Sequence, residues 1–230
     1  MKPIKFEPIS ETSLLMSFDP IIDDEILNHI CNTVDILTKT TNPWLFEIIP
    51  SFNTILIQFD PLEMDHAQIT SVLKKIFKNQ SEMDATQQTE TIYIPVCYAP
   101  EVAPDIISTA LILNLDLYEM IDLHVKPVYR VYAMGFAPGF GYLGPLDRKL
   151  YLKRKSTPSI NIPAGSVAIA ANQTAIYPCK TPGGWHIIGK TTKQMIDTTE
   201  KFKTILKVGA KVRFFPVSLS EYISSGGKKC

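Results

Sequence analysis

The chain has 230 residues, of which 45% are apolar, and its 23 Lys and Arg residues balance 23 Asp and Glu residues. This apolar fraction supports a sizeable core and excludes a disordered protein. Zero formal charge gives no support for a nucleic-acid partner or an anionic membrane surface. A near-neutral surface resists association poorly, which favours a partner protein.

The four cysteines, Cys31, Cys97, Cys179 and Cys230, stand far apart in the chain. They form no CxxC and no Cys/His pair at metal-ligand spacing, so we expect free thiols in a reducing compartment and no bound metal. The N-terminus does not resemble a leader, and no apolar run reaches the roughly 20 residues of a membrane span. These features predict a cytoplasmic protein.

The first 80 residues alternate between strand-like and helix-like patterns. Strands are predicted over 4–9, 12–18, 44–49 and 54–59, and helices after Asp23 and after Asp65. Each helix has a single apolar stripe, so both must cover the same face of a small antiparallel sheet. A ferredoxin-like α/β sandwich is the simplest fold with this order. Residues 79–90 have almost no apolar content, which predicts domains at 1–84 and 85–230.

The second half has a different pattern. A strand over 91–96 and a helical stretch over 103–124 precede short strands separated by Gly- and Pro-rich turns. Those strands are predicted over 128–134, 166–170, 174–177, 184–189 and 212–216. The pattern is compatible with a closed barrel or with a sandwich. The polar, Gly-rich tail over 224–230 is predicted to fray.

The stretch GFAPGFGYLG, residues 135–144, contains four of the eleven glycines together with two Phe and one Tyr. It follows a predicted strand, where binding sites are often built. It matches neither GxGxxG nor a P-loop. Two interpretations remain open, a pocket with aromatic walls and a bulged turn that caps the barrel.

Three later stretches, 157–170, 171–178 and 181–191, also mix small residues with polar donors. Exposed turn N–H groups beside glycine can hold a carboxylate or a phosphate. Trp185 is either a platform for a flat ligand or a core residue. The candidate substrate- or anion-binding residues of these motifs are Gly135, Phe136, Pro138, Gly139, Phe140, Tyr142, Pro163, Gly165, Ser166, Thr174, Tyr177, Gly183, Gly184 and Trp185.

A basic run over 147–155 precedes these motifs. It is either a solvated loop or an anion clamp, with Arg154 best suited to bidentate contact. His29 and His66 are predicted on the surface of the first-half helices. His124 and His186 lie beside the Gly-rich motifs and can move protons near neutral pH. No GxSxG, HExxH or paired-carboxylate spacing accompanies them.

Taken in order, GFAPGFGYLG, Thr157-Pro158, PAGSVAIA from residue 163, QTAIYP from 173, PGGW from 182 and IGKT from 188 resemble the family of 5-oxoprolinase B subunits. That family is also described as allophanate hydrolase subunit 1 or Kip-type kinase inhibitors. The resemblance covers essentially the whole chain and is densest over 124–191. It implies a ferredoxin-like N-terminal domain followed by a cyclophilin-like β-barrel.

The resemblance also implies a function. A multi-subunit 5-oxoprolinase uses ATP to open 5-oxo-L-proline to L-glutamate, and this chain would act in it with A- and C-type subunits. ATP belongs to that complex and not necessarily to this chain. Phosphorylation of the lactam oxygen needs cations and N–H donors around the developing charge. We expect His186, His124 and Gln173 as catalytic residues, with Arg154 and Thr174 lining the site.

Two alternatives follow from the same family: an inhibitor of a sporulation-type histidine kinase, and a carboxyltransferase-type subunit acting on a urea-like substrate. Two positions depart from the family pattern. Ser159 stands where an Arg commonly follows Thr-Pro, which leaves the substrate open. Ala171-Asn172 stands where a Gly pair is usual, and we expect Asn172 to tolerate left-handed geometry.

Overall fold

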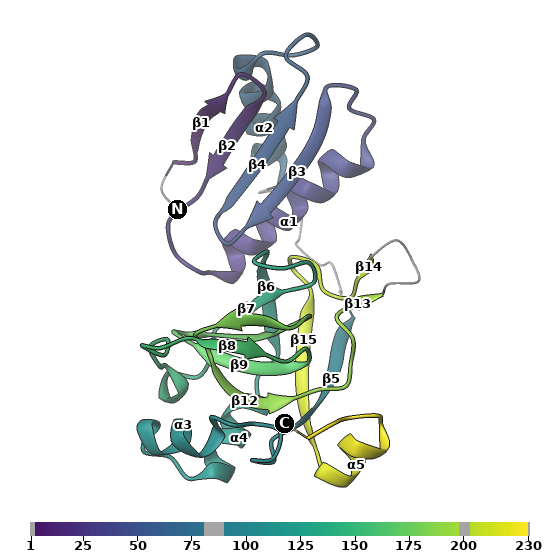
Figure 1. Cartoon of the computed structure of the whole chain (residues 1–230). Coiled ribbons are helices and arrows are strands. Elements are labelled where there is room, and N and C mark those ends of the chain that lie inside the picture. Colours follow the sequence, from purple (N-terminus) through teal and green to yellow (C-terminus); the bar gives the residue numbers. More distant parts are fainter. Residues whose placement is uncertain (1–2, 81–89, 198–202, 230) are drawn as a thin grey trace. The chain divides into compact units, whose positions relative to one another are not determined.

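The structure, a computed structural model, describes residues 3–80, 90–197 and 203–229 (Figure 1). The chain divides into two compact units, Met1–Gln88 and Thr89–Cys230. The boundary predicted between residues 84 and 85 lies outside the described residues.

The first unit is a four-stranded antiparallel sheet with two helices. Its elements are β1 (Lys5–Ser10), β2 (Ser13–Ser17), α1 (Asp24–Lys39), β3 (Leu45–Ser51), β4 (Thr54–Phe59) and α2 (His66–Gln80). The strands lie in the order β1-β2-β4-β3 (Figure 1). Every element agrees with the predicted pattern to within a few residues.

Helix α1 is capped by Asp23, whose carboxylate accepts hydrogen bonds from Glu25 N at 2.8 Å and Ile26 N at 3.2 Å. Its apolar stripe shares one core with the stripe of α2 and with inward residues of β2 and β4. The buried residues of that core are Leu14, Met16, Phe18, Ile26, Ile30, Leu37, Trp44, Ile55, Ile57, Phe59, Ile69 and Leu73. The prediction that both helices cover one sheet face is confirmed.

The second unit is a closed β-barrel with flanking helices. Its barrel strands are β5 (Thr91–Cys97), β6 (Tyr129–Met134), β7 (Gly141–Gly144), β9 (Ser166–Ala170), β10 (Gln173–Ile176), β12 (His186–Lys190) and β15 (Lys211–Val217). They run in the order β6-β15-β5-β12-β9-β10-β7, and pairing of β7 with β6 closes the circle. The structure thus decides for the barrel over the sandwich.

Shorter elements surround the barrel. They are α3 (Ile106–Leu113), α4 (Leu117–Val125), the 3-10 turn η1 (Arg148–Leu150), α5 (Leu219–Ser224) and two ribbons, β8 (Ser159–Ile162) with β11 (Thr181–Gly183) and β13 (Ile196–Asp197) with β14 (Lys203–Thr204). Helices α3 and α4 lie together at one end of the unit, and α5 lies beside β5 (Figure 1).

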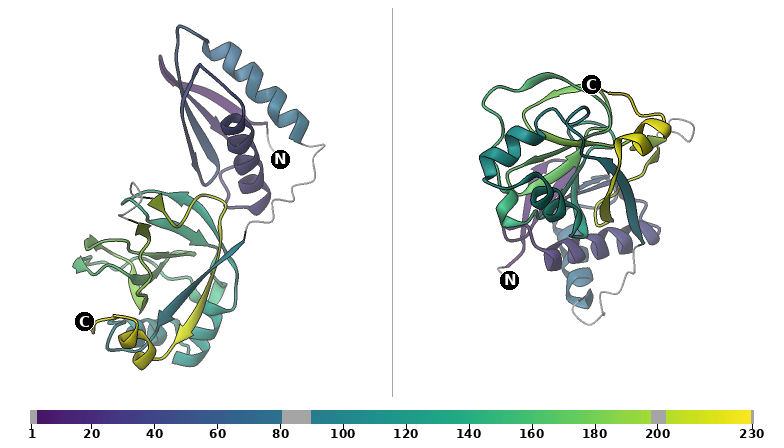
Figure 2. Two further views of the ribbon diagram at one scale, coloured as in Figure 1. Left: turned by 90° about the vertical axis from the view of Figure 1, so that its right-hand side faces the viewer. Right: turned by 90° about the horizontal axis from the view of Figure 1, so that it is seen from below.

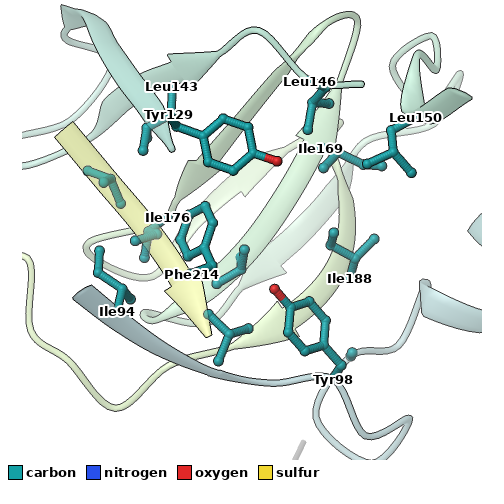
Figure 3. Close-up of a cluster of buried hydrophobic side chains, with 14 of the residues drawn as sticks. Ile94, Tyr98, Tyr129, Leu143, Leu146, Leu150, Ile169, Ile176, Ile188 and Phe214 are labelled. Carbon is teal, nitrogen blue, oxygen red and sulfur yellow. The ribbon is translucent and has the colours of Figure 1, made fainter. Parts of the chain in front are cut away.

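Successive residues of β9 and β10 point to opposite faces of the sheet and belong to two different apolar clusters. Ile169 and Ile176 point into the barrel, where they pack with Tyr129 and Phe214 (Figure 3). Val167 belongs to the same cluster. Their neighbours on β9 and β10, the alanines at 168, 170 and 175, belong to a second cluster on the outer face of the same strands. This follows from the two-residue period of a strand.

Three predictions for the second half need correction. The helical stretch over 103–124 is two helices, because Asn114 adopts a left-handed conformation (φ 54°) and ends α3. The second part of GFAPGFGYLG is strand β7 rather than turn. The short strands β8, β11, β13 and β14 went unpredicted, because two to four residues carry too little periodicity to register.

The described part of the C-terminal tail forms backbone hydrogen bonds with α5. A capping box between Ser218 and Glu221 begins α5. After the helix, Gly226 N donates to Ile223 O at 3.0 Å and Gly227 N donates to Tyr222 O at 2.9 Å. These bonds fold the tail back beside α5, near the C-terminal end marked in both views of Figure 2. Among the described helices, none has the length and apolar character that crossing a bilayer requires.

Candidate functional site

GFAPGFGYLG forms a tight loop between β6 and β7. Gly135 N donates to Phe140 O at 3.1 Å, and Phe140 N donates to Ala137 O at 3.0 Å. Gly139 has φ 80°, and a Cβ there would lie 2.6 Å from Ile196 Cγ1, so this position needs glycine. Phe136 has φ 73° and is 60% exposed. A bulky residue in this region is strained, and such strain gathers at ligand and partner sites.

The aromatic residues of the motifs meet on the outer face of the barrel. Phe140 contacts Tyr142, Tyr177 and Trp185, with ring centroids 5.0, 5.4 and 5.9 Å apart in edge-on geometry. Phe136 meets the edge of Phe140 at 5.2 Å. Phe140, Tyr177 and Trp185 are buried. The group is therefore a packed second core that supports neighbouring surfaces, and Trp185 is a core residue rather than an open platform.

Gly183 and Tyr177 fit each other closely. A Cβ at Gly183 would lie 2.3 Å from the Tyr177 hydroxyl oxygen, so any larger residue would displace the ring. Burial raises the pKa of Tyr177. Tyr177 is thus a neutral, fixed side chain, held between the aromatic cluster and the cavity described below.

Arg154 is exposed and lies over the ring of Trp185, with its Cζ atom 5.9 Å from the ring centroid. The loop that carries it is tied to the PGGW motif, because Lys155 N donates to Gly184 O at 2.7 Å. The two motifs predicted to contribute a cation and an aromatic wall are therefore adjacent. Arg154 stays open to an anionic group from solvent or from a partner.

His124 lies in the last turn of α4 and is fully buried. Its Nδ1 atom lies 2.7 Å from Tyr98 Oη, and its Nε2 atom lies 2.9 Å from Thr174 Oγ1. Thr174 Oγ1 donates onward to Ala168 O at 3.1 Å. The chain of hydrogen bonds is satisfied when Tyr98 donates to Nδ1 and Nε2–H donates to Thr174.

The His124 ring also stacks on Phe214 at 4.8 Å. Burial lowers the pKa of His124 from 6.5 to about 3. The residue is therefore neutral at physiological pH, with both ring nitrogens engaged. This arrangement favours a structural role for His124 and Thr174, in contrast to the catalytic role expected for His124.

His186 and Gln173 lie on different faces of the sheet. His186 is buried and shares a cross-strand row with Ile169 and Thr174, on the inner face. Its Nε2 atom lies 3.0 Å from Lys153 O. Gln173 is half-buried and belongs to the opposite, outer face, because neighbours along a strand alternate. Both residues lie toward the end of the barrel where β9 turns into β10.

That turn also corrects a prediction. Ala171, not Asn172, takes the left-handed conformation, with φ 51°. Ala171 forms an isolated bridge with Leu152, with N–H···O distances of 2.6 and 3.2 Å. The bridge fixes the backbone, and Asn172 contributes its carbonyl to Leu146 N at 2.9 Å.

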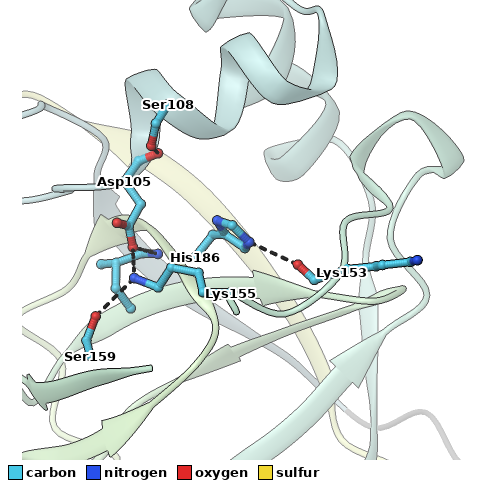
Figure 4. Close-up of polar contacts among 7 residues, drawn as sticks. Asp105, Ser108, Lys153, Lys155, Ser159 and His186 are labelled. Atoms are coloured by element: carbon cyan, nitrogen blue, oxygen red, sulfur yellow. Dashed lines mark hydrogen bonds and ion pairs between the residues drawn. The ribbon is translucent and has the colours of Figure 1, made fainter. Parts of the chain in front are cut away.

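Ser159 takes part in an ion-pair cluster that the sequence did not predict (Figure 4). Lys155 Nζ lies 2.7 Å from Asp105 Oδ2 and donates to Ser159 Oγ at 3.0 Å. The same Asp105 oxygen accepts a hydrogen bond from Ile187 N at 2.8 Å. The small Ser159 hydroxyl thus serves a lysine that already neutralises a carboxylate, so this position holds no free cation for a substrate.

A cavity of about 440 Å³ lies beside the other end of β12. Its lining residues are Ala164, Gly165, Tyr177, Pro178, Lys190, Thr191, Thr192, Lys193, Gln194, Met195, Tyr222, Ser225, Gly226, Gly227 and Lys228. They include residues of the PAGSVAIA, QTAIYP and IGKT motifs together with the folded-back tail. Within the described ranges, no three His, Cys, Asp or Glu side chains gather in a way that could hold a metal ion.

The predicted residues therefore form two groups rather than one site. Gly165 and Tyr177 line the cavity and Ser166 is their neighbour, while Arg154, Trp185, His186 and Gln173 lie toward the other barrel end. His186 and Lys190 are four residues apart on β12, which is roughly 13 Å along a strand. Pro138, Pro163 and Gly184 belong to the turns that shape these groups, and Gly135 to the strained loop.

The lysines of the cavity were missed. Lys190 ends a strand just after Gly189, and Lys193 follows it at three residues, in the sequence GKTTK. The position of a lysine in an otherwise apolar strand could have indicated a functional residue, because lysine is almost never fully buried unless it is paired. Lys228 could not be found from sequence, since only the folded-back tail brings it to the cavity.

Comparison with known proteins assigns the chain to a class. Residues 4–206 match the family model of the carboxyltransferase domain, subdomain C and D. The 5-oxoprolinase B subunit of Bacillus subtilis (strain 168) is 33% identical over 227 residues, which cover 95% of each chain. The protein of the same name from Escherichia coli O157:H7 is 31% identical and covers 90% of this chain and 94% of its own.

A solved structure agrees with this assignment. The crystal structure of TTHA0988 superimposes with a TM-score of 0.79 at 29% identity and covers 90% of this chain. This chain spans 40% of the length of TTHA0988. The chain therefore belongs to the family of 5-oxoprolinase B subunits, within the carboxyltransferase C and D domain class.

Proposed function

We propose that this chain is the B subunit of an ATP-dependent 5-oxoprolinase and opens 5-oxo-L-proline to L-glutamate together with A- and C-type subunits. The observation that carries the proposal is the likeness to the 5-oxoprolinase B subunit of Bacillus subtilis along 95% of both chains. The match extends along nearly the whole of both chains.

The chemistry requires activation of the lactam, because its amide is stabilised by resonance. Transfer of the γ-phosphoryl group of ATP to the amide oxygen releases ADP and makes the carbonyl carbon electrophilic. Attack by one water breaks the C–N bond, the nitrogen leaves as a protonated amine, and a second water hydrolyses the resulting acyl phosphate to glutamate and phosphate. Cations and N–H donors stabilise the charge that develops on the way. This chain carries exposed Arg154 at one barrel end and a group of lysines at the other. Neither group includes a complete catalytic set, which supports a reaction shared with partner subunits.

Within this chain, we assign proton handling to His186 and substrate orientation to Gln173. His186 Nε2 donates to Lys153 O, which leaves Nδ1 as the acceptor. Gln173 presents an amide that can both donate and accept. His124 acts as a positioning residue through Thr174, because its own nitrogens are engaged.

ATP does not fit the N-termini of four helices of this chain. Asp23, Asp65 and Asp116 accept the free N–H groups of α1, α2 and α4, and Glu221 stands in the first turn of α5. A carboxylate at each of these four positions repels phosphate, so these helices do not offer the usual phosphate site. We assign the ATP of the reaction to the assembled complex, with phosphate contacts from loops or from a partner.

A surface on α3 and α4 supports association with a partner. Ile107, Leu111, Ile112 and Tyr118 are 55, 75, 61 and 85% exposed, although all four are large and apolar. Helix α3 is apolar on more than its buried side, which is unusual for a helix that faces water. We assign this surface to the C-type subunit.

We further propose that the domains span 1–84 and 85–230 and are ferredoxin-like and cyclophilin-like, respectively. From β2 to α2, the first unit has the element order of the split βαβ fold. In the reference fold, a strand that follows α2 occupies the sheet edge beside the first strand. Here β1 occupies that edge, beside β2. That substitution keeps the antiparallel order and supports a permuted form of the ferredoxin-like fold. The closed seven-stranded barrel supports the second assignment.

Reconstitution tests the proposal. This chain is mixed with the A- and C-type subunits, each component is omitted in turn, and ATP-dependent release of glutamate from 5-oxo-L-proline is measured. We expect activity only in the complete mixture. Gln173→Ala and His186→Ala should lower kcat roughly a hundredfold, while Lys229→Gln, on the exposed tail, should leave it unchanged. Turnover without this chain, or full activity of both alanine variants, would contradict the proposal.

One observation favours a second candidate. The family model over residues 4–206 describes a carboxyltransferase domain, which supports a subunit that transfers a carboxyl group to a urea-like substrate. That activity would depend on a biotinylated partner protein. Avidin added to the reconstituted mixture should abolish it, whereas the oxoprolinase would be insensitive to avidin.

A further inference from the structure

The cavity beside the end of β12 is strongly cationic. Among its described lining residues are three lysines, Lys190, Lys193 and Lys228, and none is Asp or Glu. Lys190 is buried, with only 8% of its surface exposed. Ammonium groups that share one cavity repel one another, and a bound anion removes that repulsion.

A buried hydroxyl lies in the same row of the sheet. Tyr177 follows the pair Ile176–Val167 and so stands opposite Ser166, and Ser166 is paired with Lys190 on the next strand. Residues directly opposite across antiparallel strands share a face. Ser166 is 1% exposed, and its Oγ has no hydrogen-bond partner. An unsatisfied donor thus lies between two residues that line the cavity.

The walls of the cavity are held in place by backbone contacts. Thr191 N donates to Gly165 O at 2.8 Å, and a Cβ at Gly165 (φ 80°) would lie 2.2 Å from Thr191 O. On the opposite wall, Tyr222 Oη donates to Lys228 O at 3.3 Å, and the Tyr222 ring packs on Gly227. Lys193 Nζ donates to Tyr93 O at 3.2 Å, which anchors the side chain and uses one of its three hydrogens.

We propose that this cavity binds the oxyanion of a small molecule, a carboxylate or a phosphate group. The volume of about 440 Å³ suits one small ligand. Three lysines and two hydroxyl-bearing residues, Thr191 and Thr192, are among the residues that line the space. Charge-assisted hydrogen bonds from these groups favour an oxyanion over any neutral ligand. The lysines act as binding residues.

Calorimetric titration of the full chain tests this inference. The probes are 5-oxo-L-proline, inorganic phosphate and 2-pyrrolidone, which is the same lactam without its carboxylate. We expect binding of at least one anion, weakened by added salt, and no binding of 2-pyrrolidone. Tighter binding of 5-oxo-L-proline would identify a carboxylate site, and tighter binding of phosphate would identify a phosphate site.

A matched pair of variants locates the binding. Lys228→Gln should weaken anion binding roughly tenfold, and Lys229→Gln, one residue further and outside the lining, should leave it unchanged. Lys190→Gln should weaken binding at least as much, and its fold is checked by circular dichroism. If Lys190→Gln does not fold, the comparison of Lys228→Gln with Lys229→Gln, both at exposed positions, still tests the inference.

Three outcomes would overturn the inference: no anion binds, 2-pyrrolidone binds as well as 5-oxo-L-proline, or Lys228→Gln binds like Lys229→Gln. Binding is measured on this chain alone. A negative result would therefore leave the oxoprolinase proposal standing, and a failed reconstitution would leave a positive binding result standing.

Discussion

His124 illustrates how one residue can change its meaning between sequence and structure. Its position before a Gly-rich motif suggests a proton carrier, since histidine titrates near neutral pH. In the fold it is surrounded by Tyr98, Tyr129 and Phe214, and its nitrogens join two strands and a helix through Thr174. Burial disfavours the imidazolium and makes the residue a neutral connector.

The pKa of His124 predicts a dependence of stability on pH. It is about 3 in the folded protein and near 6.5 in the unfolded chain. Between these values the unfolded chain binds a proton that the folded protein refuses, so the free energy of unfolding falls as pH drops below 6.5. From pH 7 to pH 4.5 this residue should cost roughly 2–3 kcal/mol.

Urea denaturation of the wild type and of His124→Gln at both pH values measures the effect. Gln keeps a donor and an acceptor but cannot titrate, so its loss of stability over the same range should be smaller by that amount. His29, His66 and His186 are present in both proteins and cancel in the comparison. Equal losses would show that His124 is protonated in the folded state.

For GFAPGFGYLG, the sequence predicts the kind of structure, a shaped loop, but only part of what its aromatic residues do. Four glycines beside large rings indicate a shaped loop, and the structure has one. The choice between pocket wall and barrel cap depended on distant partners, Tyr177 and Trp185, which pack against Phe140. The described lining residues of the cavity include none from GFAPGFGYLG, and the motif reaches the cavity only through Tyr177, which packs against Phe140.

At the scale of elements, Asp105 connects a helix, a strand and a loop. It precedes α3 yet makes no side-chain cap bond, because its carboxylate is turned toward Lys155 and Ile187 N. The two side chains of the ion pair are 19 and 21% exposed, so the pair is mostly shielded from solvent. Loss of one partner leaves the other charge without compensation.

Substitution of Asp105 separates the two contacts. Asp105→Ala removes the ion pair and the acceptor of Ile187 N, and should lower the free energy of unfolding by about 3 kcal/mol. Asp105→Asn keeps an acceptor for Ile187 N and should cost clearly less. Chemical denaturation gives both values. Equal costs would mean that the Ile187 contact contributes nothing measurable.

Element prediction succeeded where periodicity was long and failed where it was short. Helices α1 and α2 and strands β2 and β4 follow from apolar stripes that extend over several turns or pairs. Strands β8 and β11 have four and three residues and exist because they pair with each other over the outer apolar cluster. Such pairing is a property of the fold rather than of either segment.

The whole molecule contains two sets of apolar clusters, one in each unit. The first unit has a single core between its sheet and its two helices. The second unit has the barrel interior, the outer aromatic cluster and a small group around Tyr222. Because each unit has its own buried apolar core, we expect each to fold by itself.

A fragment of residues 90–230 should therefore fold alone. We expect a single cooperative thermal transition, near-ultraviolet circular dichroism from its packed aromatic residues, and the same pH dependence from His124 as in the full chain. The matched control is the fragment with His124→Gln. A broad transition without an aromatic signal would show that the barrel depends on residues 1–89.

The sequence alone determined the two-unit organisation, the α+β class, the positions of the long elements and, through its motifs, the family. These are properties of local pattern: periodicity, caps and turn residues act within a few positions of the chain. Tertiary structure alone decided that the barrel closes, because closure needs pairs between strands far apart in the chain. One of them joins β5 in parallel to β15, more than a hundred residues later. It also decided which polar residues gather, since Lys190, Ser166 and Lys228 come together only through strand register and the folded-back tail. Register and closure depend on contacts between distant segments, which no local pattern specifies.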